Sequence, residues 1–250
     1  MTVVMPQTAP LIEVTTCRCL GAKIMLHGEN FAAAKKEADA RTERDQLAYI
    51  HGFYDDAIIA GQGTMPLEIL EQVPKVDAIV APIGGAGLIA GLAIAAKKIR
   101  LGIKIIGVES SATGSYVAAL KRGKPISILP RAILADGLAV SCVGPNAFAH
   151  ARDLVDGVIT VSEKWIALAI PRYAELEKTV VEGAAAPLAA MLAGKLSHLE
   201  NKLVVLAVCG GNIDPFVLSR VIEKGLVAEG RLCRFTVTIS DRPGGLAALS

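Results

Sequence analysis

The stretch VDAIVAPIGGAGLIAGLAIAA, Val76 to Ala96, decides the fold that we expect. It opens on a short apolar run, which is typical of a buried parallel strand. Pro82 cannot donate a hydrogen bond to a sheet, and the glycines at 84, 85 and 87 allow a tight turn. The apolar pattern then resumes from Leu88 as a helix. A strand, a glycine turn and a helix start in this order predict an α/β fold with a parallel sheet.

The glycine turn is also a candidate ligand site. Backbone amides that carry no side chains and lie at the positive end of a helix can bind a phosphate group. The simpler interpretation is a tight turn with no ligand, and the turn alone does not separate the two.

Composition bounds the classes of protein that fit. The chain has 250 residues, of which 52% are hydrophobic, so it can bury a full core in one or two domains. The net charge is only +2 and aromatic residues make up 4%, which argues against a nucleic-acid partner. The uncharged run from Ala78 to Ala96 approaches the roughly 20 residues of a membrane span. Pro82 and several glycines interrupt it, so we expect no membrane partner.

Cysteine usage and the start of the chain indicate the compartment. The five cysteines are odd in number and show no CxxC spacing, so neither a metal site nor a disulfide framework is predicted. The start, MTVVMPQTAP, has no basic segment followed by a long apolar core. A reducing, cytoplasmic location is therefore expected.

The first part of the chain alternates strand and helix patterns. We expect strands at Thr2 to Met5, Ala22 to Leu26 and Leu47 to Ile50, with helices at 11–20 and 31–46 between them. From Gly52 the sequence changes to FYDDAIIAGQGT, a candidate seam between two lobes. Residues 1–51 would then belong to a smaller lobe and residues 52–230 to a larger one. The adjacent acids Asp55 and Asp56 are expected to be solvated or to cap a helix rather than to act in catalysis.

The second part of the chain repeats the pattern. A helix to about Glu71 precedes the Val76 strand, and further strands are expected at Lys104 to Glu109, Val158 to Val161 and Leu203 to Val208. The last of these ends on Cys209 and Gly210, so glycines follow two buried strands. In open parallel sheets, ligands bind in a crevice at the carboxyl ends of the strands. We therefore expect both strand ends to open onto one crevice.

A nicotinamide cofactor is one possible ligand of this crevice. Gly85, Gly87 and Ala90 satisfy GxGxxA after a strand, and Glu109 ends the next strand 22 positions after Gly87. This spacing is close to that of the dinucleotide-binding fingerprint. Spacing alone leaves the alternative of an NAD-binding Rossmann protein open.

Several motifs, taken in their order, resemble one known family. They are TVVMP, IAGQGTMPLEI, APIGGAGLIAG, ADGLAV, VVEGAAAPLAA and VCGGNID. Together they are similar to the threonine and serine dehydratases (ammonia-lyases), which belong to fold type II of the pyridoxal phosphate enzymes, and the resemblance covers roughly Thr2 to Ile222. It implies a two-lobed α/β fold of the tryptophan synthase β type, with parallel twisted sheets flanked by helices. It also implies pyridoxal 5'-phosphate as cofactor, bound between the lobes.

The resemblance assigns roles to particular residues. The loop of Gly84, Gly85, Ala86, Gly87 and Leu88 would wrap the cofactor phosphate. Cys209, followed by Gly210, holds the place of the residue that faces the pyridine nitrogen. Glu182 lies in the VEGA motif and would orient the site as part of the catalytic machinery. Without the resemblance, Cys209 could equally be a small buried side chain, and Glu182 could be an acid at the start of a helix.

A thiol facing the ring has a chemical consequence. With an ordinary pKa of about 8.5, a thiol is a weak donor and holds a protonated ring less firmly than a carboxylate would. Such a ring is a modest electron sink and suits β-elimination from a hydroxyamino acid. The expected reaction is loss of water and then of ammonia from a small 2-amino-3-hydroxy acid, which leaves a 2-oxo acid. The intact enzyme is expected to be a homo-oligomer.

Two departures from the family pattern qualify this expectation. The Schiff-base lysine of the family lies in an S-x-K-x-R-G segment, which an SxGNHA segment follows, and neither occurs in these 250 residues. We therefore expect this chain to be inactive alone, as a fragment, an incomplete gene model or a non-catalytic remnant that binds a phosphate ligand or a partner chain. Ser115 stands where serine racemase-like members carry a metal-binding Asp, so a racemase is the less favoured alternative.

The tail from Arg234 resembles the start of an ACT-type regulatory domain over residues 231–250, with Phe235, Val237 and Ile239 alternating as in a strand.

Overall fold

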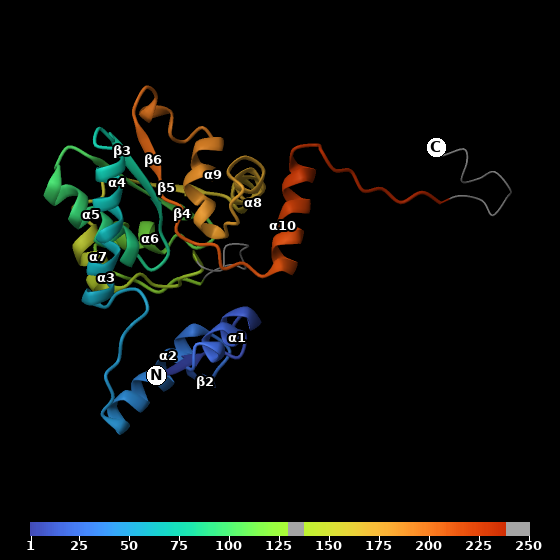
Figure 1. Cartoon of the computed structure of the whole chain (residues 1–250). Coiled ribbons are helices and arrows are strands. Elements are labelled where there is room, and N and C mark those ends of the chain that lie inside the picture. Colours follow the sequence, from blue (N-terminus) through green and yellow to red (C-terminus); the bar gives the residue numbers. More distant parts are fainter. Residues whose placement is uncertain (130–137, 239–250) are drawn as a thin grey trace.

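A computed structural model describes residues 1–129 and 138–238. Its N-terminal unit holds two parallel strands, β1 (Thr2–Met5) and β2 (Lys23–Leu26). Helices α1 (Leu11–Cys19) and α2 (Phe31–Asp45) accompany them. Asn30 begins α2 by accepting a hydrogen bond from the Ala33 amide at 3.0 Å. In Figure 1 this unit, coloured blue, lies below the larger part of the chain and is joined to it by a linker.

The third strand expected in this unit does not form. Leu47 to Ile50 has no regular structure, and Leu47 and Ile50 are 52% and 68% exposed. Gln46 ends α2 in the left-handed region (φ 49°), and the residues after it pair with neither β1 nor β2. The apolar residues of this segment therefore bury no common face on the sheet, and the strand prediction was wrong.

The larger part of the chain is built on a four-stranded parallel sheet in the order β5-β4-β3-β6. Its strands are β3 (Ala78–Pro82), β4 (Lys104–Ser110), β5 (Gly157–Val161) and β6 (Val204–Leu206). Each was expected from the sequence, with ends that differ by at most two residues. All of β3 is buried, as the apolar run predicted. Pro82 is tolerated in this central strand because β6 pairs with β3 only as far as Val80.

Helices cover both faces of this sheet, as Figure 1 shows. One face packs against α5 (Gly87–Ile99) and α7 (Pro145–Ala151), and the other against α8 (Glu163–Arg172) and α9 (Ala186–Leu192). The remaining helices are α3 (Asp56–Gln62), α4 (Thr64–Gln72), α6 (Ser115–Arg122), the π-helix η2 (Tyr173–Glu177), the 3₁₀ turns η3 (Gly183–Ala185) and η4 (Ser197–Leu199), and α10 (Pro215–Ala228). Two apolar cores, one on each face, fix the sheet in place.

The single helix expected up to Glu71 is divided into α3 and α4 at Gly63. A Cβ atom at Gly63 would lie 3.0 Å from the Ala60 carbonyl oxygen and 3.4 Å from that of Gly91. One at Gly91, on α5, would lie 2.1 Å from the Ile59 carbonyl oxygen. The break therefore occurs where α3 and α5 approach each other backbone to backbone.

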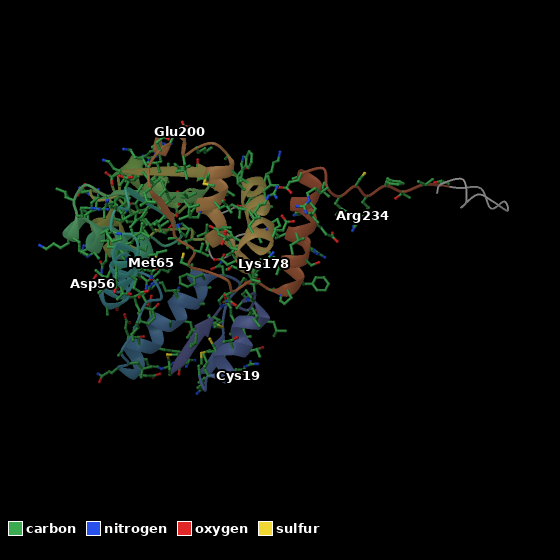
Figure 2. All side chains as sticks on the ribbon, turned by 45° about the horizontal axis from the view of Figure 1, so that its top comes forward. Cys19, Asp56, Met65, Lys178, Glu200 and Arg234 are labelled. Carbon is green, nitrogen blue, oxygen red and sulfur yellow. The ribbon has the colours of Figure 1, made fainter. Side chains whose placement is uncertain are left out.

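The C-terminal segment does not form the expected strand within its described residues. Residues 232–238 have no regular structure, and Phe235 is 76% exposed. Figure 2 shows Arg234 on a segment that leaves α10 and runs away from the rest of the chain. Alternation of apolar residues does not make a strand where no neighbouring strand supplies hydrogen bonds. Ile239, and Ala135 to Gly137 of the ADGLAV motif, lie outside the described residues.

In the part of the chain that the structure describes, no helix is long and apolar enough to cross a membrane.

Candidate functional site

The carboxyl ends of β3 and β6 lie side by side at one cavity. The two strands pair in parallel, with Ala78 opposite Val204 and Val80 opposite Leu206. A cavity of about 250 Å³ lies beyond their ends. It is lined by Gly52, Phe53, Ile58, Gln62, Pro82, Gly84, Gly85, Ala86, Gly87, Leu88, Leu138, Val140, Glu182, Ala184 and Cys209. The crevice expected from the sequence is therefore present, and it brings the glycine loop, Glu182 and Cys209 together.

The glycine loop presents the start of α5 to this cavity. Ala86 adopts a left-handed conformation (φ 72°), and α5 begins at the next residue. No side chain caps this helix, and the first hydrogen bond to its preceding turn is donated by Ala90 to the Ala86 carbonyl at 3.0 Å. The amides before Ala90 therefore have no acceptor within the helix. They form the positive end of a 13-residue helix at the cavity wall.

Packing requires glycine at two positions of this loop. A Cβ atom at Gly85 would lie 2.1 Å from a ring carbon of Phe53, and one at Gly87 would lie 1.8 Å from the Phe53 carbonyl oxygen. The loop is thus held directly against the linker that joins α2 to α3. On the other side, the Gly85 carbonyl accepts a hydrogen bond from the Gly144 amide at 3.1 Å, just before α7.

Glu182 caps the short helix η3. Its carboxylate accepts hydrogen bonds from the amides of Gly183 and Ala184. It also lies against Gly210, where a Cβ atom would be 2.2 Å from Glu182 Oε1. Gly210 does not line the cavity itself, but it keeps room for the Glu182 carboxylate beside Cys209. Among the described lining residues, Glu182 is the one charged side chain.

Cys209 stands three residues beyond β6, where it is exposed and lines the cavity. Loss of water around the sulfur and, as a smaller effect, the negative charge of Glu182 together raise the pKa of the thiol to about 11. At neutral pH the side chain is therefore a protonated thiol, a neutral and weak hydrogen-bond donor.

Glu109, the acid of the possible dinucleotide fingerprint, does not reach the cavity. It is 1% exposed and accepts hydrogen bonds from the amides of Tyr116 (2.7 Å) and Val117 (3.2 Å) and from Ser115 Oγ (3.3 Å). Burial raises the pKa of this carboxyl group, and the hydrogen bonds offset only part of that effect. Its oxygens hold the start of α6, so no ribose can use them, and this disfavours the nicotinamide alternative.

The two adjacent acids of the linker have the roles expected of them. Asp55 caps α3 by accepting from the Ala57 amide at 2.9 Å. Asp56 accepts from Asn146 Nδ2 at 3.2 Å. Among residues 1–129 and 138–238, no group of three or more His, Cys, Asp or Glu side chains is gathered to hold a metal ion.

Comparison with known proteins places the chain in a family. Residues 1–210 match the model described as "Pyridoxal-phosphate dependent enzyme". The chain belongs to this family. It is similar to the L-threonine ammonia-lyase of Geobacter sulfurreducens, with 44% identity over 250 residues, which are 100% of this chain and 62% of that relative. The chain thus spans somewhat less than two thirds of the length of this relative.

Solved structures agree with the family assignment. The processed form of threonine deaminase isoform 2 from Solanum lycopersicum superimposes with a TM-score of 0.82 at 35% identity, over 89% of this chain and 66% of that one. Serine racemase from Dictyostelium discoideum gives a TM-score of 0.76 at 32% identity, over 85% of this chain and 68% of that one. The α/β fold with parallel sheets, expected from the sequence, is that of fold type II pyridoxal phosphate enzymes.

Eight lining residues were not foreseen as site residues: Gly52, Phe53, Ile58, Gln62, Pro82, Leu138, Val140 and Ala184. The first four come from the linker and α3. The available signal was the stretch GFYDDAIIAGQGT, which marked a seam between lobes and carried one of the family motifs. Its acids suggest chemistry by their residue type, whereas its aromatic and amide side chains do not.

Proposed function

We propose that this chain is the larger part of a pyridoxal phosphate-dependent threonine/serine ammonia-lyase. The observation that supports this most is the shared cavity, which joins an uncapped helix start at β3 to a thiol at β6. An NAD-binding protein would instead need a free acid at the end of β4, where Glu109 is engaged with α6.

The residues present suit the two ends of the cofactor. A phosphate would be held by the amides at the start of α5. No Lys or Arg is among the described lining residues, so the positive end of α5 would be the group that offsets the negative charge of the phosphate. Glycine at positions 85 and 87 lets Phe53 pack directly against this loop, which holds the loop in place at the cavity wall. Cys209 would face the ring nitrogen as a neutral donor. Bound pyridoxal phosphate supplies an electron-withdrawing ring that weakens the bonds at Cα of an amino acid.

The chain's own groups would bind and orient rather than transfer protons. The Glu182 carboxylate accepts hydrogen bonds from the η3 amides and lies against Gly210. We assign Glu182 the role of holding Gly210 and the neighbouring Cys209 in position. A thiol that stays protonated gives the ring a weak partner, which favours rapid loss of a β-hydroxyl group over reactions that need a long-lived charge on the ring. The substrate class is therefore a small 2-amino-3-hydroxy acid, and the product a 2-oxo acid with ammonia.

A serine racemase-like activity is the weaker alternative. The similarity to the Dictyostelium racemase is lower than that to the Geobacter lyase. Glu109 and Ser115 hydrogen-bond to each other at the start of α6, which leaves few hard oxygen ligands there for a divalent cation.

A cofactor titration tests the binding half of the proposal. The full chain is titrated with pyridoxal phosphate, with pyridoxal and with NAD, and borohydride is added at the end. We expect saturable uptake of the phosphate form, weaker uptake of pyridoxal, and no single lysine trapped by borohydride, because the S-x-K-x-R-G segment is not in these residues. Preference for NAD, or equal binding of the two pyridoxal forms, would reject the proposal.

A chimera tests the catalytic half. The family's lysine and SxGNHA segments, taken from the Geobacter relative, are placed upstream of Met1. We expect one lysine trapped by borohydride and release of a 2-oxo acid from threonine or serine. A Cys209→Asp variant of the chimera serves as the matched comparison, since a carboxylate partner would favour retention of charge on the ring and slow elimination. A chimera that traps the lysine but racemises serine without releasing a 2-oxo acid would favour the alternative.

A further inference from the structure

The linker between α2 and α3 gathers aromatic rings over the glycine loop. The protein has only ten Phe, Tyr and Trp residues. Four of them, Phe31, Tyr49, Phe53 and Tyr54, surround His51, each with its ring centroid within 6.0 Å of the imidazole. We define these five residues as the linker cluster. It lies between the N-terminal unit, which supplies Phe31 from α2, and the loop before α5.

His51 is the centre of the linker cluster. It is 3% exposed, and its ring stacks on Tyr54 at 3.5 Å between centroids with 17° between planes. Its Nδ1 accepts a hydrogen bond from the Phe53 amide at 3.3 Å. Burial lowers the pKa of the imidazole to about 4, so at neutral pH the ring is uncharged. Because Nδ1 accepts, the remaining proton is on Nε2.

The other ring nitrogen shows that histidine is not the most favourable residue for packing alone at this position. Nε2 is buried and has no hydrogen-bond partner among the described residues. An unpaired buried N–H is unfavourable, and a purely apolar ring would avoid it. What an apolar ring could not do is accept the Phe53 amide. The acceptor at Nδ1 is therefore the feature that distinguishes His51 from a phenylalanine.

Phe53 transmits this contact to the glycine loop. The Phe53 ring occupies the space that a Cβ atom at Gly85 would need. The Phe53 carbonyl oxygen occupies the space that a Cβ atom at Gly87 would need. No side chain separates the Phe53 backbone from the start of α5. A shift of Phe53 would therefore move or release the loop whose amides face the cavity.

We propose that His51 is a positioning residue for the phosphate-binding loop. By accepting the Phe53 amide and stacking on Tyr54, it fixes Phe53 against Gly85 and Gly87 and so holds the α5 amides in place for a phosphate. The inference rests on the proposed function only for the identity of the ligand, because the contact between Phe53 and the loop is independent of any ligand.

Two substitutions separate the acceptor from the ring. His51→Phe keeps an aromatic ring but removes the acceptor. His51→Asn loses the ring, yet its side-chain oxygen can accept from the amide two residues on, as in an Asx turn. Binding is measured with pyridoxine 5'-phosphate and with pyridoxine, which have no aldehyde and do not react with surface lysines. We expect His51→Phe to weaken the phosphate ligand at least tenfold and to leave pyridoxine unchanged, whereas His51→Asn stays within about threefold of the original chain.

Amide hydrogen exchange of residues 84–89 in the chain without ligand gives a second readout. His51→Phe should speed exchange in this loop, and His51→Asn should not. If His51→Phe fails to fold, Phe53→Leu replaces it, since it removes the ring from Gly85 and should give the same selective effect. Unchanged loop exchange in His51→Phe, or equal weakening of both ligands, would overturn the inference. If the original chain binds neither ligand but the loop exchange changes as expected, the proposed function fails and the positioning role stands.

Discussion

Cys209 and Glu182 are coupled at the cavity, and their coupling can be measured by the reactivity of the thiol. A pKa of about 11 leaves a thiolate fraction at pH 8 that is roughly two hundredfold below that of a cysteine with the ordinary pKa of about 8.5. We expect iodoacetamide to alkylate Cys209 slowly at pH 8 and faster only as the pH approaches 11. Mass spectrometry compares it with the exposed Cys19 in the same sample.

Removing the acid should shift that profile. Glu182→Gln takes away the negative charge that helps to raise the pKa of Cys209, so alkylation should begin at lower pH. The variant Asp153→Asn, which removes an exposed carboxylate that does not line the cavity, is the control and should leave the profile unchanged. Identical profiles for Glu182→Gln and the original chain would show that the two side chains do not interact.

Glu109 is expected to be structural, although it ends a strand where a dinucleotide-binding acid would stand. Glu109→Gln places an NH₂ group against amides that now donate to a carboxylate, so at least one buried donor loses its partner. We expect the free energy of unfolding to fall by about 1–3 kcal/mol, as urea denaturation would measure. Cofactor binding should persist in the folded fraction. A loss of cofactor binding without a fall in the free energy of unfolding would show that Glu109 acts in the binding site.

The residues that sequence reasoning found and those it missed differ in a physical way. The glycine loop and Cys209 follow buried strands whose apolar runs are evident in the sequence, and parallel neighbours bring such ends together. Phe53 and His51 act through contacts that depend on how a non-repetitive linker crosses the loop, and no periodicity encodes that path. Their roles follow from the contact of Phe53 with Gly85 and Gly87, which are about thirty positions further along the chain.

At the scale of elements, the same distinction explains which strands were predicted. The strands of the larger sheet are flanked by helices that bury both faces, so apolar content alone marks them. The Leu47 and Phe235 segments have an equally apolar texture, but no strand among the described residues pairs with either of them. Strand formation depends on that neighbour, which a local pattern does not contain.

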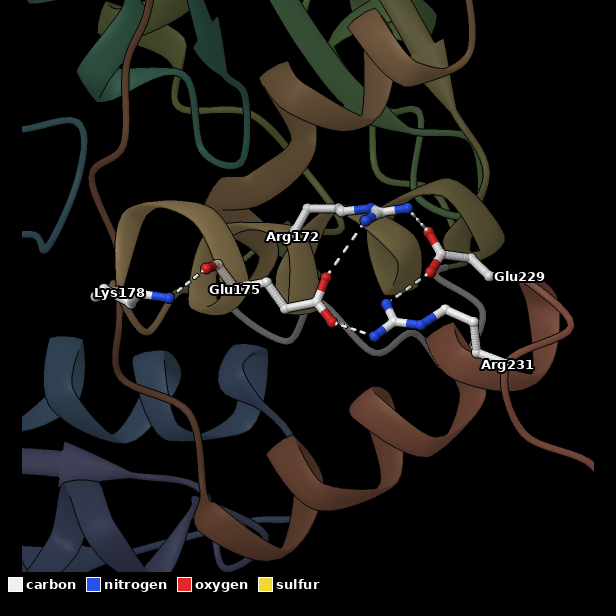
Figure 3. Close-up of polar contacts among 5 residues, drawn as sticks. All are labelled: Arg172, Glu175, Lys178, Glu229 and Arg231. Atoms are coloured by element: carbon white, nitrogen blue, oxygen red, sulfur yellow. Dashed lines mark hydrogen bonds and ion pairs between the residues drawn. The ribbon is translucent and has the colours of Figure 1, made fainter.

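An ion-pair network attaches the residues just after α10 to the end of α8 and to the π-helix η2 (Figure 3). Arg231 pairs with Glu175 at 2.6 Å and with Glu229 at 3.1 Å, and Arg172 pairs with the same two acids at 3.3 and 2.6 Å. We expect Arg231→Gln to speed amide exchange in η2 and the last turn of α10. Arg234→Gln, which loses one exposed pair with Glu223, is the matched control. A 1 M salt solution should reduce the difference between the two variants.

The network should also depend on pH in a defined direction. The hydrogen bond from Arg231 holds the pKa of Glu175 below its ordinary value. A group whose pKa is lower in the folded state stabilises the fold above its unfolded pKa and loses this effect as the pH falls through its folded pKa. Exchange in α10 should therefore approach that of Arg231→Gln on acidification. A difference between the two proteins that persists at pH 2 would contradict the assignment to these charges.

At the scale of the whole molecule, the lobe boundaries at residues 51/52 and 230/231 and the homo-oligomeric state remain predictions. The two parts touch through few contacts, among them Phe31 with Phe53 at 6.2 Å between ring centroids and Asn212 Nδ2 donating to Glu13 Oε1 at 3.0 Å. Such sparse contacts favour relative motion of the parts. How firmly each part is folded then depends mainly on its own core.

The two parts should differ strongly in stability. Residues 1–50, all of which the structure describes, bury only Val14 and Ala34, and their sheet has two strands. A two-stranded sheet with so little buried apolar surface is marginal in water, whereas β3 and β4 lie between two cores. We expect amides in β1 and β2 to exchange at least a hundredfold faster than those in β3 and β4, and limited proteolysis to cut first within residues 46–50. In the chimera, the added segments should slow exchange in β1 and β2, whose unit leaves Leu11 74% exposed, but not in β3. Equal protection of both sheets in the chain alone would mean that the N-terminal unit is stabilised by contacts beyond its own core.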